Sequence, residues 1–293
     1  MLEVNEKTVT DAVLESLKDT PDDRLMTIMT ALIKHLHGFV RDIEPTEAEW
    51  MQAIEFLTAT GQMCSNIRQE YILLSDTLGV TTLVDAINHR YPSGATSNSV
   101  LGPFFFEGRE TMENGADIGG KAIGLPLYFQ GQVQDVDGNP VADAQVDIWH
   151  SDADGHYDMM LPGFEAGETA MRAMLRTEAD GSFWFRSIMP TSYPIPDDGP
   201  VGAMMRATRR SNMRPGHVHF VINAPGYERL TTMVFVDGDD HLSADPVFGV
   251  KAELIQDFVH CDSGTLPDGS RSATPFAQSG FTFTMAPVQK AKG

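Results

Sequence analysis

Two histidines stand one residue apart in the segment Arg214-Pro215-Gly216-His217-Val218-His219. Residues i and i+2 of a β-strand point to the same face, so both imidazoles can approach one ion. Imidazole is a good ligand for zinc, copper, iron and nickel. Val218, Phe220 and Ile222 are apolar, which favours a strand that is buried on both faces. The alternative is a solvated pair of surface histidines, because the His-x-His pattern alone is not specific.

A metal centre needs more than two ligands, and the chain offers two tyrosines in loops rich in glycine and proline. Tyr157 ends the segment Trp149-His150-Ser151-Asp152-Ala153-Asp154-Gly155-His156-Tyr157, and Tyr193 lies within residues 189–200. Stiff loops at strand ends suit preorganised ligands. Two phenolates with two neutral imidazoles favour ferric iron, because a trivalent ion lowers the pKa of a phenol far below its usual value near ~10. The alternative is that both tyrosines only pack within their loops.

The elements that must position these side chains differ between the two halves of the chain. The first hundred residues read as helical, since apolar residues recur at helical spacing from Leu25 to Leu36, and Thr46 with Glu49 fits a capping box. Further helices are predicted at about 66–78 and 82–89. Proline, glycine and small polar residues gather between Tyr91 and Ser99, which indicates a domain boundary.

Beyond that boundary the apolar period changes from 3.6 to 2. The predicted strands include 144–149, 174–177, 183–185, 217–222, 231–236 and 281–285. Asp180-Gly181 predicts a hairpin between the second and third of these. Many short strands without long helices between them favour a sandwich or barrel over a parallel sheet. We therefore expect an α+β protein, with an N-terminal helical domain (1–98) on a C-terminal antiparallel β-sandwich (99–293) that carries the chemistry.

Composition narrows the function further. Lys and Arg number 21 against 41 Asp and Glu, so the net charge is −20. Phosphate backbones and anionic lipids repel such a chain, and the cluster Arg206, Arg209, Arg210 and Arg214 has no stacking aromatics interleaved. No apolar run is long enough to span a membrane. With no secretory signal and only Cys64 and Cys261, we expect a cytoplasmic protein that binds neither nucleic acid nor membranes.

Five ordered motifs point to a known family. They are Gln69-Glu70-Tyr71-Ile72-Leu73-Leu74-Ser75-Asp76-Thr77-Leu78-Gly79, Leu101-Gly102-Pro103-Phe104-Phe105, the Gly-x-Tyr loop at Tyr157, Tyr-Pro-Ile-Pro-x-Asp-Gly-Pro from Tyr193, and Arg-Pro-x-His-x-His up to His219. With them the chain resembles the intradiol ring-cleavage dioxygenases of the catechol and hydroxyquinol group. Together the motifs span about 150 residues, so they are far more specific than any one alone.

The resemblance implies a ligand set and a reaction. Tyr157, Tyr193, His217 and His219 are expected to bind one non-haem Fe(III) per chain, which opens an aromatic diol with O2 between its two oxygen-bearing carbons. Tyr193 is expected to leave the metal and take up a substrate proton. Arg214 is expected to stabilise charge that develops on the substrate. A plain salt bridge is the alternative role for Arg214.

The resemblance also implies an apolar, flat substrate pocket. Its expected walls are Leu73, Asp76, Val100, Leu101, Gly102, Pro103, Phe104, Ile195, Pro196 and Val247. Asp76 is expected to accept a hydrogen bond from a third ring hydroxyl, with a helix-terminal cap as its alternative role. The stretch Asp245-Pro246-Val247-Phe248-Gly249-Val250-Lys251 resembles the hydroxyquinol branch, and Met233 stands where the catechol branch usually has Gln. Hydroxyquinol 1,2-cleavage to a ring-opened muconate or maleylacetate is therefore the expected reaction.

Relatives in this family form homodimers through the helical domain, often with a phospholipid at the interface, so a homodimer and a bound lipid are expected here. The alternative is that the helices simply cover the β domain. Three other functions remain open at this point: catechol or chlorocatechol cleavage on the same scaffold, a transthyretin-like sandwich that binds small aromatics without chemistry, and a zinc hydrolase built on His217 and His219.

Overall fold

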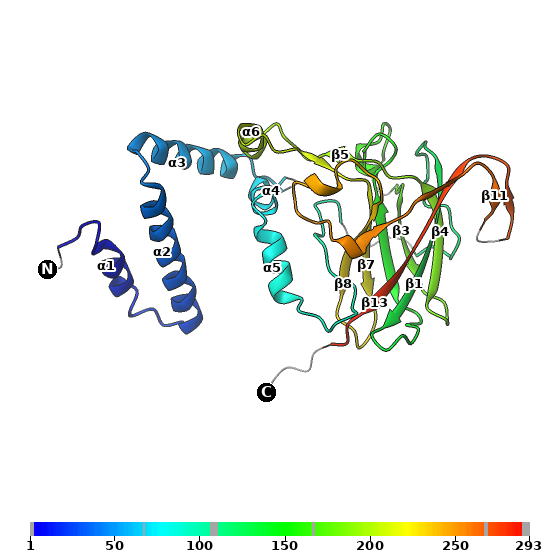
Figure 1. The fold of residues 1–293 in the computed structure, drawn as a ribbon, viewed down its shortest axis with the longest axis horizontal. Coiled ribbons are helices and arrows are strands. Elements are labelled where there is room, and N and C mark those ends of the chain that lie inside the picture. Colours follow the sequence, from blue (N-terminus) through cyan, green and yellow to red (C-terminus); the bar gives the residue numbers. More distant parts are fainter. Residues whose placement is uncertain (1–2, 67, 106–110, 166–167, 267–268, 289–293) are drawn as a thin grey trace. The chain divides into compact units, whose positions relative to one another are not determined.

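The computed structural model describes residues 3–66, 68–105, 111–165, 168–266 and 269–288. Its backbone contacts divide the chain into two compact units, Met1–Gln62 and Met63–Gly293. In Figure 1 the first unit is drawn in blue, and the second unit carries all the strands. Each unit is described by itself below.

Three helices form the first unit: α1 (Val9–Ser16), α2 (Asp23–Ile43) and α3 (Glu47–Gln62). The Asp22 carboxylate accepts a hydrogen bond from the Leu25 amide at 2.7 Å and so caps α2. The predicted capping box of α3 is confirmed, because Glu49 Oε2 accepts from the Thr46 amide at 2.8 Å and Thr46 Oγ1 accepts from the Glu49 amide at 3.3 Å.

The apolar stripe of α2 is confirmed as a helical pattern, yet none of its residues is buried. Helix α3 likewise exposes a large part of its apolar surface. The exposed apolar side chains on the two helices are Leu25, Ile28, Leu32, Leu36, Phe39, Val40, Ile43, Trp50, Met51, Ile54 and Leu57. Monomeric soluble proteins rarely leave apolar patches of this size uncovered.

The second unit begins with α4 (Glu70–Thr77) and α5 (Val80–Asn88), and contains α6 (Pro200–Ala207) further along the chain. Helix α4 is shorter than the 66–78 predicted. Between α4 and α5, Gly79 adopts φ +72, a conformation that glycine takes without strain. The buried Glu70 carboxylate accepts from the Val201 amide at 3.2 Å and pairs with Arg68 at 2.9 Å. This contact joins the first turn of α4 to the first turn of α6.

Two sheets form the β part of this unit. The strands of the five-stranded sheet, in spatial order, are β3 (Arg172–Arg176), β2 (Gln145–His150), β7 (His217–Asn223), β8 (Leu230–Val236) and β9 (Ile255–Gln256). Those of the four-stranded sheet are β10 (Val259–Cys261), β13 (Phe276–Met285), β1 (Pro126–Asp135) and β4 (Ser182–Ile188). Two short pairs complete the set: β5 (Tyr193–Pro194) with β6 (Met213–Arg214), and β11 (Gly264–Thr265) with β12 (Arg271–Ser272).

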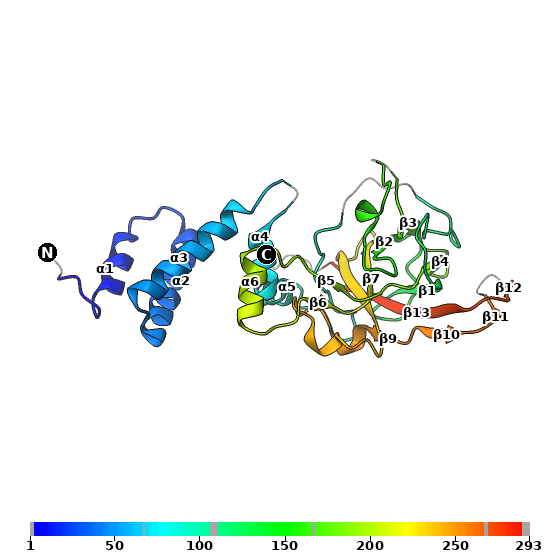
Figure 2. The same cartoon turned by 90° about the horizontal axis from the view of Figure 1, so that it is seen from above.

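The two larger sheets pack face to face as a sandwich. Phe129 of β1 contacts Phe220 of β7 with ring centroids 5.2 Å apart, and both belong to one buried apolar cluster drawn from both sheets. The α+β fold class is therefore confirmed. Most strand pairs are antiparallel, but β13 runs parallel to β1, and β9 runs parallel to β8. Figure 2 shows β13 beside β1 in the view from above.

The predicted hairpin around Asp180-Gly181 is wrong. The turn itself forms, since the Glu178 amide bonds the Ser182 carbonyl at 2.8 Å. Its two strands then separate, because β3 pairs with β2 in one sheet and β4 pairs with β1 in the other. The turn therefore leads the chain from one sheet to the other. The local pattern of turn residues is the same for such a crossing as for a hairpin. Among the described residues, no helix is both long and apolar enough to cross a lipid bilayer.

Candidate metal centre and active site

Strand β7 places His217 and His219 at the centre of the five-stranded sheet, between β2 and β8. Both side chains are buried, and their Nε2 atoms lie 3.1 Å apart. The Pro215 carbonyl lies 2.7 Å from His217 Nδ1. Because a carbonyl oxygen can only accept, Nδ1 carries the proton and Nε2 presents its lone pair. The alternative of a solvated histidine pair is therefore wrong.

The two tyrosines meet the histidines from separate loops. Tyr157 follows β2 and Tyr193 begins β5, and both side chains are buried. Tyr157 Oη donates to Tyr193 Oη at 3.1 Å and lies 3.1 Å from His219 Nε2. Gly155 makes this approach possible, because it adopts φ +85 and a Cβ there would lie 2.7 Å from Cβ of Tyr193.

The four donor atoms fit a single ion. Metal–ligand bonds of about 2 Å at angles between a right angle and a tetrahedral angle separate neighbouring donors by roughly 3 Å, which matches the spacings above. Burial lowers the pKa values of His217 and His219 well below the usual range, so both imidazoles are neutral, as ligands must be. Burial, followed by the neighbouring Tyr193, raises the pKa of Tyr157 well above its usual value. A cation among these groups reverses that effect and favours phenolate.

His219 owes its orientation to packing. The indole of Trp149 stacks on the imidazole with ring centroids 4.5 Å apart and an interplanar angle of 10°. The backbone at Gly102 also lies against this ring, since a Cβ on Gly102 would be 3.2 Å from His219 Cε1. Within the described residues, no group hydrogen-bonds to His219 Nδ1. Aromatic stacking therefore does the orienting that a hydrogen bond provides for most ligand histidines.

A buried ion pair supports the Tyr157 loop. Arg172 donates from Nε to Asp158 at 2.6 Å and from Nη2 at 2.8 Å, and its Nη1 donates to the Phe104 carbonyl at 2.8 Å. The Phe104 ring stacks on Tyr157 with centroids 4.3 Å apart. The Arg172 guanidinium therefore links Asp158, the residue after Tyr157, to Phe104, whose ring packs on Tyr157.

Arg214 lies beside the donor cluster on β6, directly opposite Tyr193 on β5. Its Nη1 is 3.3 Å from His217 Nε2, and its Nε donates to Asp245 at 3.1 Å. Both side chains of this ion pair are buried. Arg214 therefore makes the salt bridge that was its alternative role, and it also points one nitrogen at the donor cluster.

The remaining predicted pocket residues lie in four segments of the chain: 73–76, 100–104, 195–196 and Val247. Phe104 contacts Tyr157, and Gly102 contacts His219. Asp76 is partly buried on α4, where burial raises its pKa while the Thr81 hydroxyl and then the Arg214 charge lower it. Val247 is buried, and its amide lies 3.5 Å from the Asp245 carboxylate.

The other predicted pocket residues adjoin these contacts in sequence. Val100, Leu101 and Pro103 flank Gly102; Ile195 and Pro196 follow Tyr193; and Leu73 precedes Asp76 by three residues. Val100 and Ile195 are buried, whereas Leu101, Pro103 and Pro196 are exposed. Sequence reasoning missed Trp149, Asp158, Arg172 and Asp245 as supports of the centre. Of these four, only Trp149 had a local signal in the sequence, namely the strand period that places it on β2.

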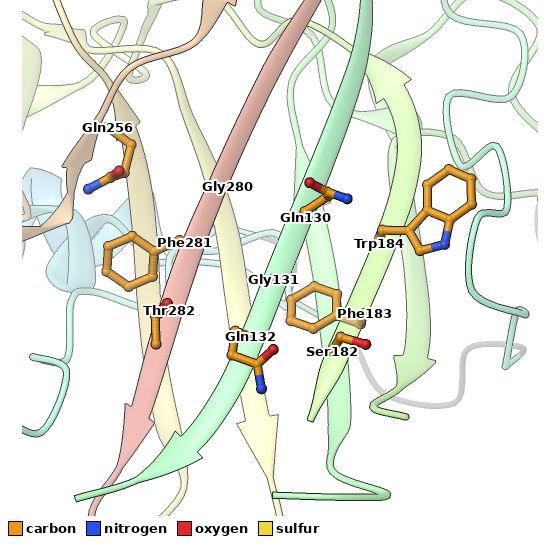
Figure 3. A pocket seen from close by; sticks show the side chains of 10 residues that line it. All are labelled: Gln130, Gly131, Gln132, Ser182, Phe183, Trp184, Gln256, Gly280, Phe281 and Thr282. Atoms are coloured by element: carbon orange, nitrogen blue, oxygen red, sulfur yellow. The ribbon is translucent and has the colours of Figure 1, made fainter. Parts of the chain in front are cut away.

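A separate cavity of about 650 Å³ lies away from this centre. Figure 3 shows its lining, which comes from β1, β4 and β13 of the four-stranded sheet together with Gln256. None of the four candidate metal ligands contributes to it. Its side chains are mainly glutamines and aromatic rings, without a histidine, carboxylate or cation among them. The cavity therefore offers no chemistry comparable with that of the donor cluster.

The chain is similar to known proteins over nearly its whole length. The family model "Dioxygenase" matches residues 100–285, and "Catechol dioxygenase N terminus" matches residues 22–96. The chain is 50% identical over 265 residues to 6-chlorohydroxyquinol 1,2-dioxygenase of Cupriavidus pinatubonensis, covering 90% of this chain and 95% of that protein. It is 44% identical over 287 residues to hydroxyquinol 1,2-dioxygenase of Nocardioides simplex, covering 98% and 97%.

A solved structure of hydroxyquinol 1,2-dioxygenase from Pseudomonas putida DLL-E4 superposes with a TM-score of 0.90 at 40% identity, covering 97% of this chain and 99% of that one. The family matches cover most of the chain, the relatives align over nearly their whole length, and the fold is shared. This chain therefore belongs to the intradiol ring-cleavage dioxygenase family and is an oxidoreductase of its hydroxyquinol 1,2-dioxygenase branch.

Proposed function

We propose that this protein opens the ring of hydroxyquinol (benzene-1,2,4-triol) with O2, between two neighbouring hydroxylated carbons, and gives a ring-opened muconate or maleylacetate. The observation that carries the proposal is the convergence of Tyr157, Tyr193, His217 and His219 on one buried point beside Arg214. The similarity to proteins named hydroxyquinol 1,2-dioxygenase supports the choice of substrate.

The same four side chains are our proposed ligands for one Fe(III) per chain. Two phenol oxygens and two imidazole nitrogens form a donor set that suits a ferric ion better than zinc, for which sulfur and nitrogen ligands are typical. When bound, Fe(III) supplies the Lewis acidity that holds an aromatic diol through its oxygens and makes the ring reactive towards O2. Every other contribution comes from the protein.

Tyr193 and Arg214 have distinct proposed roles. The Tyr193 oxygen, deprotonated to a phenolate, acts as the base that takes up a proton from a substrate hydroxyl, since Tyr193 is the less deeply buried of the two tyrosines. Arg214 carries a permanent charge in a buried position, where it stabilises negative charge that develops on the substrate. Arg214 on β6 lies opposite Tyr193 on β5 in the strand register. The two groups therefore act at the same side of the site.

Pocket shape and Asp76 select the substrate in this proposal. The segment from Val100 to Phe104, together with Ile195, Pro196, Val247 and Leu73, walls an apolar slot for the ring. Asp76 accepts a hydrogen bond from the third hydroxyl, the group that distinguishes hydroxyquinol from catechol. Its partial burial and the influence of the Arg214 charge on its pKa support a place near the reacting ring.

We further propose that residues 1–98 form a dimerisation and linker domain and that residues 99–293 form the catalytic domain. The exposed apolar side chains of α2 and α3 support a homodimer, with a phospholipid as a second occupant of the same apolar surface. A cytoplasmic location stays a prediction.

Oxygen uptake by the iron-loaded protein, measured with hydroxyquinol and catechol in parallel, tests this function. We expect faster uptake with hydroxyquinol, one O2 consumed per ring opened, and a visible absorption band from phenolate bound to iron. A Tyr157→Phe variant should weaken and shift that band, because Tyr193 is then the remaining phenolate ligand, and it should lose most of its activity. Faster turnover of catechol would move the substrate assignment to the catechol branch, and a colourless, iron-free active preparation would overturn the metal assignment.

A further inference from the structure

The guanidinium of Arg214 binds a carboxylate with one edge and points its remaining nitrogen at the donor cluster. Its Nε donates to Asp245 Oδ1 at 3.1 Å and its Nη2 to Asp245 Oδ2 at 3.4 Å. Its third nitrogen, Nη1, lies 3.3 Å from His217 Nε2. Because the guanidinium is planar and rigid, a carboxylate that binds the Nε and Nη2 edge determines where Nη1 points.

Asp245 binds more than Arg214. Its Oδ2 accepts from the Gly249 amide at 2.8 Å, and its Oδ1 lies 3.5 Å from the Val247 amide. The same carboxylate therefore closes the loop 245–249, in which Phe248 adopts φ +56. A Cβ on Gly249 would lie 3.1 Å from Arg214 Nη2, so this loop packs directly on the guanidinium.

The other buried arginine in the site provides a comparison. Arg172 also makes a two-pronged contact with a carboxylate, but its third nitrogen is used on a backbone carbonyl. The third nitrogen of Arg214 has only His217 Nε2 as a nitrogen or oxygen partner among the described residues. When that imidazole nitrogen serves as a metal ligand, it can no longer accept a hydrogen bond. Nη1 is then the donor left for the substrate.

We propose that Asp245 is a positioning residue, which aims Nη1 of Arg214 at the reacting ring and, through the same carboxylate, holds Val247 in the pocket wall. The inference rests on the proposed role of Arg214. It goes beyond that role, because it assigns the orientation of Arg214 and the shape of the 245–249 loop to one side chain.

A double-mutant cycle on the iron-loaded protein tests the proposal, with the variants Asp245→Asn, Arg214→Gln and both together. Asn keeps the size of the side chain but presents an NH2 group or a single neutral oxygen to the guanidinium. We expect Asp245→Asn to lower kcat/KM for hydroxyquinol by about 10- to 100-fold, mainly through kcat. In the Arg214→Gln background the same change should cost much less, about 2- to 3-fold, because only the hold of Asp245 on the 245–249 loop is left to lose.

Anaerobic binding of 4-nitrocatechol, followed by its absorption change, gives the same cycle without turnover. It decides the outcome if Arg214→Gln is too slow to assay. We expect iron content and the phenolate-to-iron band to stay unchanged in Asp245→Asn. Ser99→Ala is the matched control. The Ser99 hydroxyl donates to the Gly249 carbonyl at 2.8 Å, so its removal loosens the same loop without changing a contact of the guanidinium. Its effect should be under about 3-fold and additive with Arg214→Gln.

Two results overturn the inference: kinetics of Asp245→Asn that match the wild type, or an equal loss from Asp245→Asn in both backgrounds. The second result would assign Asp245 to the general stability of the loop. Full activity in Arg214→Gln would instead refute the proposed role of Arg214 itself, so the two failures are distinguishable.

Discussion

Trp149 and His219 lie face to face on the neighbouring strands β2 and β7, opposite each other in the sheet register, with ring centroids 4.5 Å apart. Trp149 is fully buried, and the ring of Phe105 packs against it with ring centroids 5.2 Å apart and an interplanar angle of 55°. The candidate metal ligand is thus held by a stack of rings rather than by a hydrogen bond to its second nitrogen.

Removing that stack should weaken iron binding. Trp149→Leu leaves the imidazole free to rotate, so we expect iron affinity to fall by about 10- to 100-fold, while Trp149→Phe, which keeps an aromatic face, should lose much less. The measurement is the rate of iron loss to a chelator, followed by the phenolate-to-iron absorption. Trp184→Leu on β4, in the other sheet, serves as the control. Equal iron retention in Trp149→Leu and wild type would contradict the stacking argument.

The pair Arg172–Asp158 should stabilise both the fold and the substrate pocket. Asp158→Asn leaves a buried guanidinium without its counter-charge, so we expect the free energy of unfolding to fall by about 3–5 kcal/mol. Asp143→Asn, which breaks the exposed pair with Arg176 at 3.0 Å, should cost less than about 1 kcal/mol. Urea unfolding of both variants gives the comparison. A similar small cost for both would show that the buried pair is not needed.

The Asp158→Asn variant should also raise KM for the aromatic substrate. Arg172 holds the Phe104 carbonyl at 2.8 Å, and the Phe104 ring packs on Tyr157, so a displaced guanidinium releases one wall of the pocket. Steady-state kinetics at saturating O2 separate this rise in KM from any change in kcat. An unchanged KM would confine the ion pair to a stabilising role.

His150 makes the stability of the protein dependent on pH. Its Nδ1 lies 2.7 Å from the Ser151 carbonyl and its Nε2 lies 2.8 Å from Ser187 Oγ, and burial lowers its pKa to about 4. The unfolded chain, with a pKa near ~6.5, takes up the proton first. The stability that the neutral His150 contributes to the folded state is therefore complete above about pH 6.5. It is lost as pH falls towards 4, which lowers the free energy of unfolding by roughly 3 kcal/mol in total.

The contribution of His150 is measured by urea unfolding of the wild type and His150→Gln at a series of pH values from 4 to 7.5. We expect a shallower loss of stability on acidification in His150→Gln. His35→Gln, an exposed position on α2, should keep the wild-type slope. If His150→Gln follows the wild-type curve, the pH dependence arises elsewhere.

Asp76 should govern the choice between hydroxyquinol and catechol. Asp76→Ala removes the proposed acceptor for the third hydroxyl, and a lost hydrogen bond to a charged group costs about 1.5–3 kcal/mol. We therefore expect kcat/KM for hydroxyquinol to fall by about 10- to 100-fold, with little change for catechol. Parallel kinetics on the two substrates measure the ratio, and Asp198→Asn, an exposed carboxylate paired with Arg68, is the control. Equal losses on both substrates would assign Asp76 to the fold.

Some features were predictable because they depend on neighbours in the sequence. The strand period of 2 predicts that His217 and His219 share a face, and the capping box of Thr46 and Glu49 depends on residues three apart. The two tyrosines, two histidines and Arg214 were likewise identified from residue types and motifs, and the structure brings their side chains together.

Tertiary structure alone decided the rest. Whether the chain turns back or crosses at Asp180-Gly181 depends on which strands compete for β3 and β4, and β2 and β1 bind them in different sheets. Trp149 meets His219, Arg172 meets Phe104, and Arg214 meets Asp245 across separations of 31 to 70 residues, reached only when the sheets assemble. Local periodicity predicts the face of the sheet on which a side chain lies. Its contact partners depend on the register between distant strands, and burial of the common core sets that register.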